Sequence, residues 1–245
     1  MTTEETIAAL DRGEIRAAEK VDGEWRVNED AKAAILDYFR IRKLEPIEVG
    51  PYEYVDKIPL KHDYAKLGVR VVPPATARYG AYLAPGVVMM PSYVNIGARV
   101  GAKTMVDTWA TVGSCAQIGA NVHLSGGVGI GGVLEPPNAV PVVVEDEAMI
   151  GSRCMVVGGA RVRRGATLGA GAILTPTTHV IDVETGAELP RGEAPAWSVC
   201  VGGTRPRKFP GGEFGLPCLL VLRRIEPGER DHLNDILRES GVTVG

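Results

Sequence analysis

A hydrophobic residue recurs at every sixth position through the middle of this chain. The positions are Val88, Val94, Val100, Val106, Val112, Ile118, Leu124 and Ile130, and then Val144, Ile150, Val156, Val162, Leu168, Leu174 and Val180. A period of six fits neither the 3.6-residue turn of a helix nor the alternation of an isolated strand. It is typical of a parallel β-helix built from hexapeptide repeats.

A second column of small or slim residues lies four positions after each marker. Its members are Ala98, Thr104, Ala110, Ala116, Val122, Val128, Ala148, Cys154, Ala160, Ala166, Ala172 and Thr178. One branched and one small residue per repeat suit a narrow three-sided prism, in which three repeats make one coil and the coils stack on a shared core. The fifteen markers predict about five coils. Glycine often follows the marker, as at Gly101, Gly113 and Gly119, and we expect a positive φ there.

The composition limits the classes of protein that fit. A net charge of −3 argues against a nucleic-acid-binding surface. No apolar run reaches the length of a membrane span, and the acidic start of the chain lacks the features of a signal peptide. The four cysteines are widely spaced without a C-x-x-C pair, so we expect reduced thiols in a cytoplasmic protein with no membrane partner.

Three parts are expected along the chain: an α-rich N-terminal domain over 1–75, the prism over 76–182 and a C-terminal extension over 183–245. The first part is predicted to hold helices over 1–20 and 29–42, the second capped by Asn28, and then an irregular, proline-rich segment over 46–75. Prolines in 135–141 predict an excursion from one coil. In the extension, strands over 196–201 and 219–225 are expected to flank a basic loop, and a helix over 229–239 follows.

Residues eighteen apart stack on neighbouring coils, which places Asp107, His123 and Ser125 at one corner. Asp107 and Ser125 also replace the glycine expected after the marker. An acid, an imidazole and a hydroxyl on a rigid corner suit acid–base chemistry, although a solvated turn explains the same residues. The glycines of 126–132 offer backbone N–H groups for an oxyanion. Arg153, like other arginines nearby, suits a carboxylate or phosphate.

Histidine, the commonest ligand for a catalytic metal, is scarce in this chain. The four histidines are His62, His123, His179 and His232. A site of this kind needs two or three histidines that converge, and the spacing does not bring these together within one chain. We therefore expect no metal.

Five strings make the pattern specific enough to compare with a family. They are Arg70–Ala75 (RVVPPA), Met90–Gly97 (MPSYVNIG), Met105–Cys115 (MVDTWATVGSC), Asn121–Gly127 (NVHLSGG) and Val133–Pro136 (VLEP). In these strings the chain resembles the tetrahydrodipicolinate N-succinyltransferases. The resemblance extends from about Ala9 into the C-terminal region. The resemblance implies a left-handed parallel β-helix, a homotrimer with active sites between neighbouring prisms, and a place in lysine/diaminopimelate biosynthesis. It also implies succinyl-CoA as donor and ring-opened tetrahydrodipicolinate as acceptor.

The resemblance assigns roles to individual residues. Asp107 matches the acidic active-site residue, Arg70 and Arg153 match arginines that face substrate carboxylates, and Ser125 falls in the segment lining the acceptor cleft. We expect direct acyl transfer in which Asp107 takes the proton of the attacking amine, without a covalent enzyme intermediate. The phosphates of CoA are expected at the basic loop, on Arg205, Arg207 and Lys208.

The chain departs from the family pattern in two respects. It begins later than the longer members, with less of the N-terminal helical segment. It also carries Met155 and Gly158 where those members have acids after the arginine matched by Arg153, so the role of those acids is either vacant here or filled by another residue, such as Glu135 or Glu147.

Three other functions remain open at this point. One is a related N-acyltransferase that uses acetyl-CoA or another amine. A second is a trimeric metal hydratase resembling the γ-class carbonic anhydrases, which the shortage of convergent histidines disfavours. The third is a non-catalytic trimeric scaffold, since a solenoid can exist for stacking alone.

Overall fold

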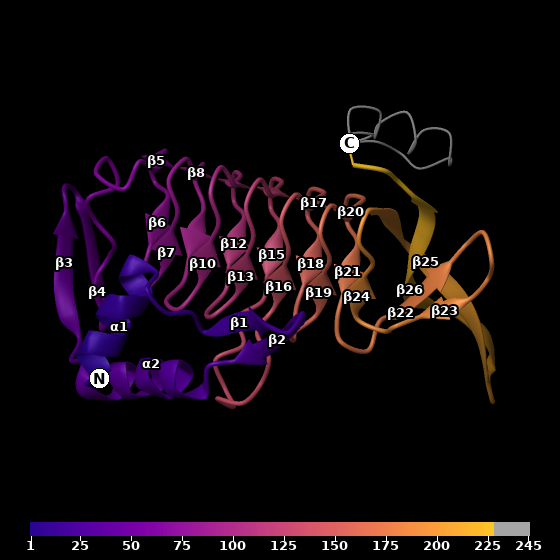
Figure 1. Cartoon of the computed structure of the whole chain (residues 1–245), viewed down its shortest axis with the longest axis horizontal. Coiled ribbons are helices and arrows are strands. Elements are labelled where there is room, and N and C mark those ends of the chain that lie inside the picture. Colours follow the sequence, from indigo (N-terminus) through magenta and orange to yellow (C-terminus); the bar gives the residue numbers. More distant parts are fainter. Residues whose placement is uncertain (228–245) are drawn as a thin grey trace.

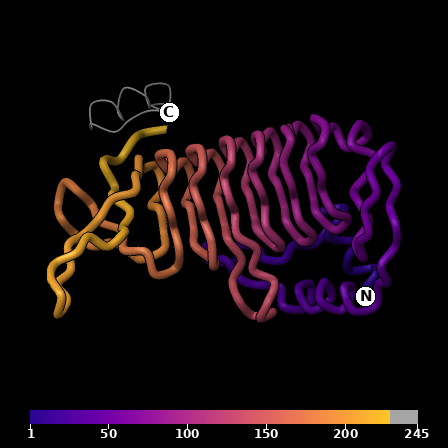
Figure 2. The backbone as a smooth tube through the Cα atoms, turned by 180° about the vertical axis from the view of Figure 1, so that it is seen from behind, coloured from indigo at the N-terminus to yellow at the C-terminus, as the bar shows by residue number. Residues whose placement is uncertain are grey.

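The computed structural model describes residues 1–227 of this chain, and it shows a long three-sided prism of two-residue strands (Figures 1 and 2). The first face is formed by parallel strands β5 (Arg70–Val71), β8 (Val88–Met89), β11 (Met105–Val106), β14 (His123–Leu124), β17 (Met149–Ile150) and β20 (Thr167–Leu168). The second face is formed by β6 (Thr76–Ala77), β9 (Tyr93–Val94), β12 (Thr111–Val112), β15 (Gly129–Ile130), β18 (Met155–Val156) and β21 (Ile173–Leu174). The third is formed by β7 (Tyr82–Leu83), β10 (Arg99–Val100), β13 (Gln117–Ile118), β16 (Val143–Val144), β19 (Arg161–Val162) and β24 (Glu193–Ala194). The predicted parallel β-helix is confirmed.

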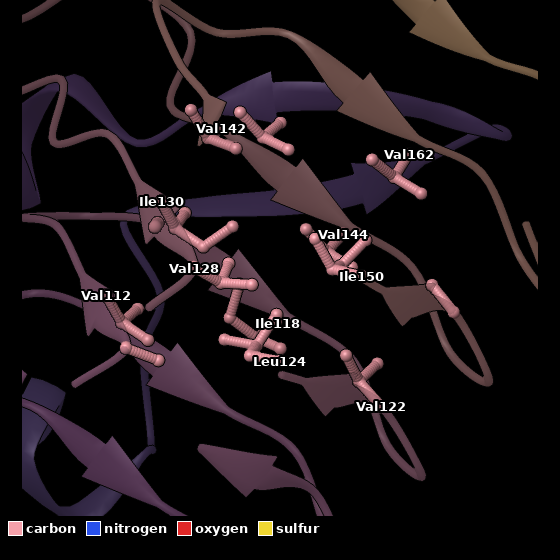
Figure 3. Close-up of a cluster of buried hydrophobic side chains, with 14 of the residues drawn as sticks. Val112, Ile118, Val122, Leu124, Val128, Ile130, Val142, Val144, Ile150 and Val162 are labelled. Carbon is pink, nitrogen blue, oxygen red and sulfur yellow. The ribbon is translucent and has the colours of Figure 1, made fainter. Parts of the chain in front are cut away.

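Both predicted columns fill the interior of the prism. The markers from Val94 to Leu174 and the small residues from Ala98 to Ala172 are at most 2% exposed. Figure 3 shows the aliphatic side chains of neighbouring coils meeting in this core. Thr104 is the polar member, and its hydroxyl donates to the carbonyl of Gly119 at 2.8 Å and accepts from the amide of Val122 at 3.0 Å. A slim hydroxyl is thus tolerated because both of its hydrogen-bonding roles are satisfied.

The prism is longer than predicted, and its first marker is out of phase. Its first strand begins at Arg70, ahead of the expected boundary at 76. Val88 pairs with Met105 and faces outward, whereas Met89 pairs with Val106 and is fully buried. The turn between β8 and β9 is one residue shorter than the turns that follow, so a count of six from Val94 back to Val88 misses the inward position by one.

The glycines after the markers have a different cause from the one predicted. Gly113 does not adopt a positive φ; the left-handed residues lie two positions later, as at Lys103, Trp109 and Cys115. A Cβ on Gly113 would lie 2.1 Å from the amide nitrogen of Gly132 in the next coil. Glycine is therefore required at this corner because backbones of adjacent coils approach too closely for a side chain.

The predicted excursion leaves the corner between β15 and β16. The other neighbouring strands from β9 to β21 begin six residues apart, whereas Gly129 and Val143 begin strands fourteen residues apart. The pairing is nevertheless preserved, because Gln117 pairs with Val143 as Arg99 pairs with Gln117. The excursion packs beside α2 (Glu29–Ile41), where the fully buried Lys32 donates from Nζ to the carbonyls of Pro136 (3.1 Å) and Ala139 (2.6 Å).

The N-terminal region contains two helices and two hairpins. Helix α1 (Thr3–Arg12) is capped by Thr2 and ends at Gly13, so the prediction of a helix over 1–20 is wrong beyond that point. Strands β1 (Ala18–Val21) and β2 (Glu24–Val27) form an antiparallel hairpin, and α2 follows with Asn28 as its cap, as predicted. A second hairpin, β3 (Glu45–Val49) and β4 (Tyr52–Asp56), replaces part of the segment expected to be irregular. No helix of the described residues is long and apolar enough to cross a membrane.

The C-terminal extension is built around a long hairpin. Strand β22 (His179–Asp182) pairs with β23 (Glu188–Leu189), and β25 (Ser198–Phe209) pairs along its whole length with β26 (Gly212–Arg224). The hairpin leaves the end of the prism, where β25 extends the first face beside β20 (Figure 1). The two predicted strands are thus parts of longer ones, and no loop separates them at 205–208. The helix expected over 229–239 lies outside the described residues.

Candidate active site

The turns that follow the first-face strands stack into one continuous ridge, which we call the first corner. It comprises Asp107–Trp109, Ser125–Gly127 and Gly151–Arg153. Each turn hydrogen-bonds to the preceding one: the amide of Gly127 donates to the carbonyl of Thr108 (2.8 Å), and the amide of Arg153 to that of Gly126 (3.0 Å). The backbone of this corner is therefore rigid, and its side chains project from fixed points.

Asp107 and His123 meet at this corner, as the eighteen-residue spacing predicts. His123 pairs with Met105, and its Nε2 lies 3.4 Å from Oδ2 of Asp107. The other carboxylate oxygen accepts from the backbone amide of Thr108 at 2.6 Å and from its hydroxyl at 3.2 Å. Burial raises the pKa of Asp107, but the hydrogen bonds from Thr108 and His123 together outweigh it and hold the pKa below the usual range.

The Asp107–His123 contact is open enough to accommodate a third group. The distance of 3.4 Å exceeds the usual range for an N–H···O hydrogen bond, and the two side chains are 29% and 41% exposed. In enzymes without substrate such contacts are often long and shorten when the substrate binds. Asp107 is thus held as a carboxylate beside a titratable imidazole that solvent can reach.

Ser125 and one glycine amide complete the polar part of the corner. Ser125 is 8% exposed and follows β14, one coil beyond Asp107. The amides of Gly127, Gly129 and Gly131 bond to carbonyls of adjacent coils, so they are not available as oxyanion donors. Within residues 1–227, the amide of Gly126 has no backbone acceptor, and a Cβ on this residue would meet only the carbonyl of Thr108 at 3.5 Å. Of the predicted oxyanion donors, Gly126 is the one that the geometry favours at this corner.

The structure does not bring the two predicted carboxylate-binding arginines together within one chain. Arg153 lies at the first corner, where its side chain covers Gly127. Arg70 is exposed on β5, four strands away along the first face, which corresponds to about 19 Å of backbone. Each lies two strands from the β11 turn that carries Asp107, one on either side of it.

The basic residues expected to bind CoA lie on strand β25. Nη2 of Arg205 lies 2.7 Å from Nε2 of His179, and the guanidinium of Arg207 lies 5.4 Å from the ring centre of Phe209. Lys208 lies opposite Glu213 in the backbone register of the hairpin. Because the hairpin leaves the prism at its C-terminal end, these three residues are at a distance from the first corner.

Thiol chemistry is not favoured at any of the four cysteines. All four are free and buried. Burial raises the pKa of Cys115 to about 12 and those of Cys154 and Cys200 to about 11, and it raises the pKa of Cys218. Thiols of this kind stay protonated at neutral pH, so they are poor nucleophiles. In the described part of the chain, no group of three or more His, Cys, Asp and Glu side chains is arranged around a possible metal position.

Comparison with known proteins identifies the family. Residues 1–41 match the family model of the tetrahydrodipicolinate N-succinyltransferase N-terminal region, and residues 141–176 match that of the hexapeptide repeat of succinyl-transferase. A protein of Acinetobacter baylyi, named 2,3,4,5-tetrahydropyridine-2,6-dicarboxylate N-succinyltransferase, is 49% identical, with 96% of this chain and 88% of that protein covered. This chain belongs to the tetrahydrodipicolinate N-succinyltransferase family. Proteins of the same name from Sodalis glossinidius (47% identical, 96% and 87% covered) and Chelativorans sp. (48%, 96% and 88%) support the assignment.

The departures from the succinyltransferase pattern are visible in the structure. Met155 projects from the second face, is 41% exposed and occupies the space beside Gly129, where a Cβ would lie 2.5 Å from its sulfur. Of the two candidate replacements, Glu147 pairs with Arg164 at the corner between the third and first faces, and Glu135 lies in the excursion beside α2. Neither glutamate lies at the first corner, so His123 is the titratable group that this chain itself places beside Asp107.

Proposed function

We propose that this protein transfers the succinyl group of succinyl-CoA to the amine of ring-opened tetrahydrodipicolinate, giving N-succinyl-2-amino-6-oxopimelate and CoA. The reaction belongs to lysine/diaminopimelate biosynthesis, and we expect it in the cytoplasm. The observation that carries the proposal is 49% identity, over 96% of this chain, to a protein named for that activity. Asp107 and His123 supply the acid–base pair that the chemistry needs.

The reaction is a direct acyl transfer. The neutral amine attacks the thioester carbonyl, a carbon–nitrogen bond forms, and the electrons of the carbonyl move onto its oxygen. Asp107 orients the amine and takes its proton, directly or through water. His123, whose Nε2 lies 3.4 Å from Oδ2 of Asp107, stabilises the charge that the pair carries. The carbon–sulfur bond then breaks and CoA leaves as a thiolate, which takes up a proton.

The oxyanion of the tetrahedral intermediate is held by backbone N–H groups, with Gly126 as the first candidate. A donor of this kind contributes about 3 kcal/mol to the stability of the transition state. Ser125 lines the acceptor cleft beside it. The proposed steps use neither a metal nor a cysteine.

The acceptor has two carboxylates, and Arg70 and Arg153 are proposed to bind them. Their separation of about 19 Å along the first face favours a cleft to which neighbouring subunits each contribute one arginine. This agrees with a homotrimer whose sites lie between prisms. Arg205, Arg207 and Lys208 are proposed to bind the phosphates of CoA at the C-terminal end.

A thiol-release assay tests the proposal. The purified protein is given acceptor with either succinyl-CoA or acetyl-CoA, and the release of CoA is followed with a thiol reagent. A much higher kcat/KM for succinyl-CoA is expected. Preference for acetyl-CoA would support the related N-acyltransferase instead, and failure to bind or cleave either ester would support a non-catalytic scaffold.

A further inference from the structure

A pocket of about 580 Å³ lies on the side of the prism away from Asp107, between the N-terminal region and the third face. The prism contributes Arg99 and Gln117, which are neighbours on adjacent strands, and Asp146 from the corner between the third and first faces. The N-terminal region contributes Arg16, Lys20 and Trp25. The pocket therefore joins two parts of the chain that are distant in sequence.

One end of this pocket carries positive charge that no carboxylate neutralises. Arg99 stacks on the ring of Tyr82, 4.1 Å from its centre, and Nη1 donates to the carbonyl of Gly13 at 3.2 Å. Burial lowers the pKa of Arg99, and the nearby guanidinium of Arg16 lowers it further. In residues 1–227, neither arginine forms an ion pair, so two adjacent cations face the pocket without a counter-charge.

The cation at the other end is already paired. Glu145 accepts from Lys20 and from Nε1 of Trp25, each at 3.0 Å, and from the backbone amide of Arg164 at 3.1 Å. Because the carboxylate of Glu145 is hydrogen-bonded to these donors, it does not neutralise the charge of Arg16 or Arg99.

Next to the arginines, the pocket also has an acceptor without a donor. Gln117 is 2% exposed, and its Oε1 has no hydrogen-bond partner within the described chain. The orientation of the amide is fixed, because Nε2 donates to the carbonyls of Cys115 (3.0 Å) and Ala116 (3.4 Å). Asp146 uses Oδ1 to accept from the amide of Ala120 at 2.8 Å, which leaves Oδ2 for another donor. A buried acceptor of this kind is costly unless a ligand or water donates to it.

We propose that this pocket binds a free α-amino acid. Its carboxylate lies between Arg16 and Arg99, and its ammonium group donates to Oε1 of Gln117 and Oδ2 of Asp146. An anion alone would satisfy the arginines but leave Gln117 without a donor, whereas a zwitterion satisfies both ends. Because the ligand would contact Arg16 of the N-terminal region as well as the prism, its binding fixes that region against the prism. The site is independent of the proposed reaction at the first corner.

Isothermal titration calorimetry on the full-length protein tests this proposal, in a buffer free of carboxylate and phosphate. The probes are the individual L-amino acids. For each one that binds, two analogues follow, the acid without its amine and the amine without its carboxylate. At least one amino acid is expected to bind at one site per chain with a Kd of about a millimolar or tighter, and both analogues about tenfold more weakly. Absence of binding at about 10 mM for every amino acid, or equal binding of the acid without its amine, would overturn the proposal.

Single substitutions test whether the ligand binds in this pocket. Arg16→Gln removes one carboxylate partner from a half-buried side chain, and about a tenfold loss of affinity is expected. Gln117→Met removes the acceptor. The melting temperature of each variant is measured to check that the variant is folded. Arg161→Gln is the matched control, because Arg161 projects from the same face without lining the pocket, and its affinity is expected to equal the wild type. Unchanged affinity in Arg16→Gln would refute the assignment.

Discussion

At the scale of single residues, Asp107 is held in its charged form by its neighbours. The amide and hydroxyl of Thr108 occupy one carboxylate oxygen, and His123 lies beside the other. The first is a local turn interaction, whereas the second depends on the stacking of coils. Asp107 is therefore both anchored by its own turn and available, through its second oxygen, to a group in the cleft.

Asp107→Asn tests the proposed role in proton transfer. The amide keeps the size of the side chain but cannot accept the proton of the amine, so kcat is expected to fall about a hundredfold or more while the protein stays folded. Steady-state kinetics measure this fall, and circular dichroism checks the fold. Asp63→Asn is the control, since the ion pair of Asp63 with Lys66 lies on the exposed surface. Near-normal turnover in Asp107→Asn would remove the base role.

A glycine at the corner between the second and third faces makes a separate prediction about stability. In Gly113→Ala, the added Cβ would lie 2.1 Å from the amide nitrogen of Gly132, so coils must move apart, at a cost of about 1–3 kcal/mol in the free energy of unfolding. Gly211→Ala is the control, because nothing lies within 4 Å of its added Cβ. Denaturation by urea compares the two variants. Equal midpoints would show that close coil stacking does not explain the glycine.

Residue-level prediction succeeded where the repeat is regular. The inward columns and the meeting of Asp107 with His123 follow from a fixed coil length, which the sequence displays directly. Val88 was assigned wrongly because one short turn shifts the phase, and Val and Met are both acceptable in the core. The positive φ was predicted at the glycines that follow the markers, but it lies two positions later. A glycine can be needed for close packing or for backbone freedom, and the sequence does not distinguish these two causes.

At the scale of elements, the excursion after β15 is held by one buried amine. Nζ of Lys32 donates to two carbonyls of the excursion, and burial lowers the pKa of Lys32. The prolines predicted that the chain leaves the coil there. They did not predict where it goes, because that depends on a lysine more than a hundred residues away.

Lys32→Met removes this attachment at similar side-chain volume. The two carbonyls lose their donor, so the free energy of unfolding is expected to fall by about 1–3 kcal/mol and proteolysis in 135–141 to accelerate. Lys43→Met, at an exposed position after α2, is the control. Between the lowered pKa of folded Lys32 and the unfolded value of about 10.4, the unfolded chain binds more protons, so the stability of wild type relative to Lys32→Met should rise with pH. A stability difference that does not change with pH would contradict a buried charged amine.

The C-terminal hairpin shows why strand prediction failed outside the repeat. Pro206 and Pro217 lie within its two strands, and proline usually argues against a strand. Here they lie in the part of the hairpin where, among the described strands, β25 and β26 pair with each other alone, since β22 pairs with β26 over Cys218–Val221 and β20 with β25 over Val199–Cys200. The basic residues were therefore placed in a loop although they lie on β25.

At the scale of the whole molecule, the second face is left uncovered and partly apolar. Met155 and Ile173 are neighbours on this face and are 41% and 56% exposed, and Trp109 at the adjoining corner is 70% exposed. The third face, in contrast, is covered by the N-terminal region. This asymmetry fits the proposal that the second face meets another subunit.

Ile173→Glu tests the assembly. A charge on this face should prevent the proposed trimer, so light scattering should give the 26.0 kDa of one chain instead of three times that mass, and turnover should be lost. Val183→Glu, at a position 47% exposed near the C-terminal hairpin, should leave both unchanged. A mass that is the same in Ile173→Glu as in wild type would place the interface elsewhere.

The excursion between β15 and β16 has a consequence for engineering. Gln117 and Val143 pair in the same register as strands joined by an ordinary coil, so the prism is insensitive to how much chain leaves and returns at that corner. Sequence can be inserted or exchanged in this loop without altering the alignment of Asp107 and His123. This corner is therefore a suitable grafting point, where a new recognition loop can be installed while the proposed catalytic pair at the first corner stays in place.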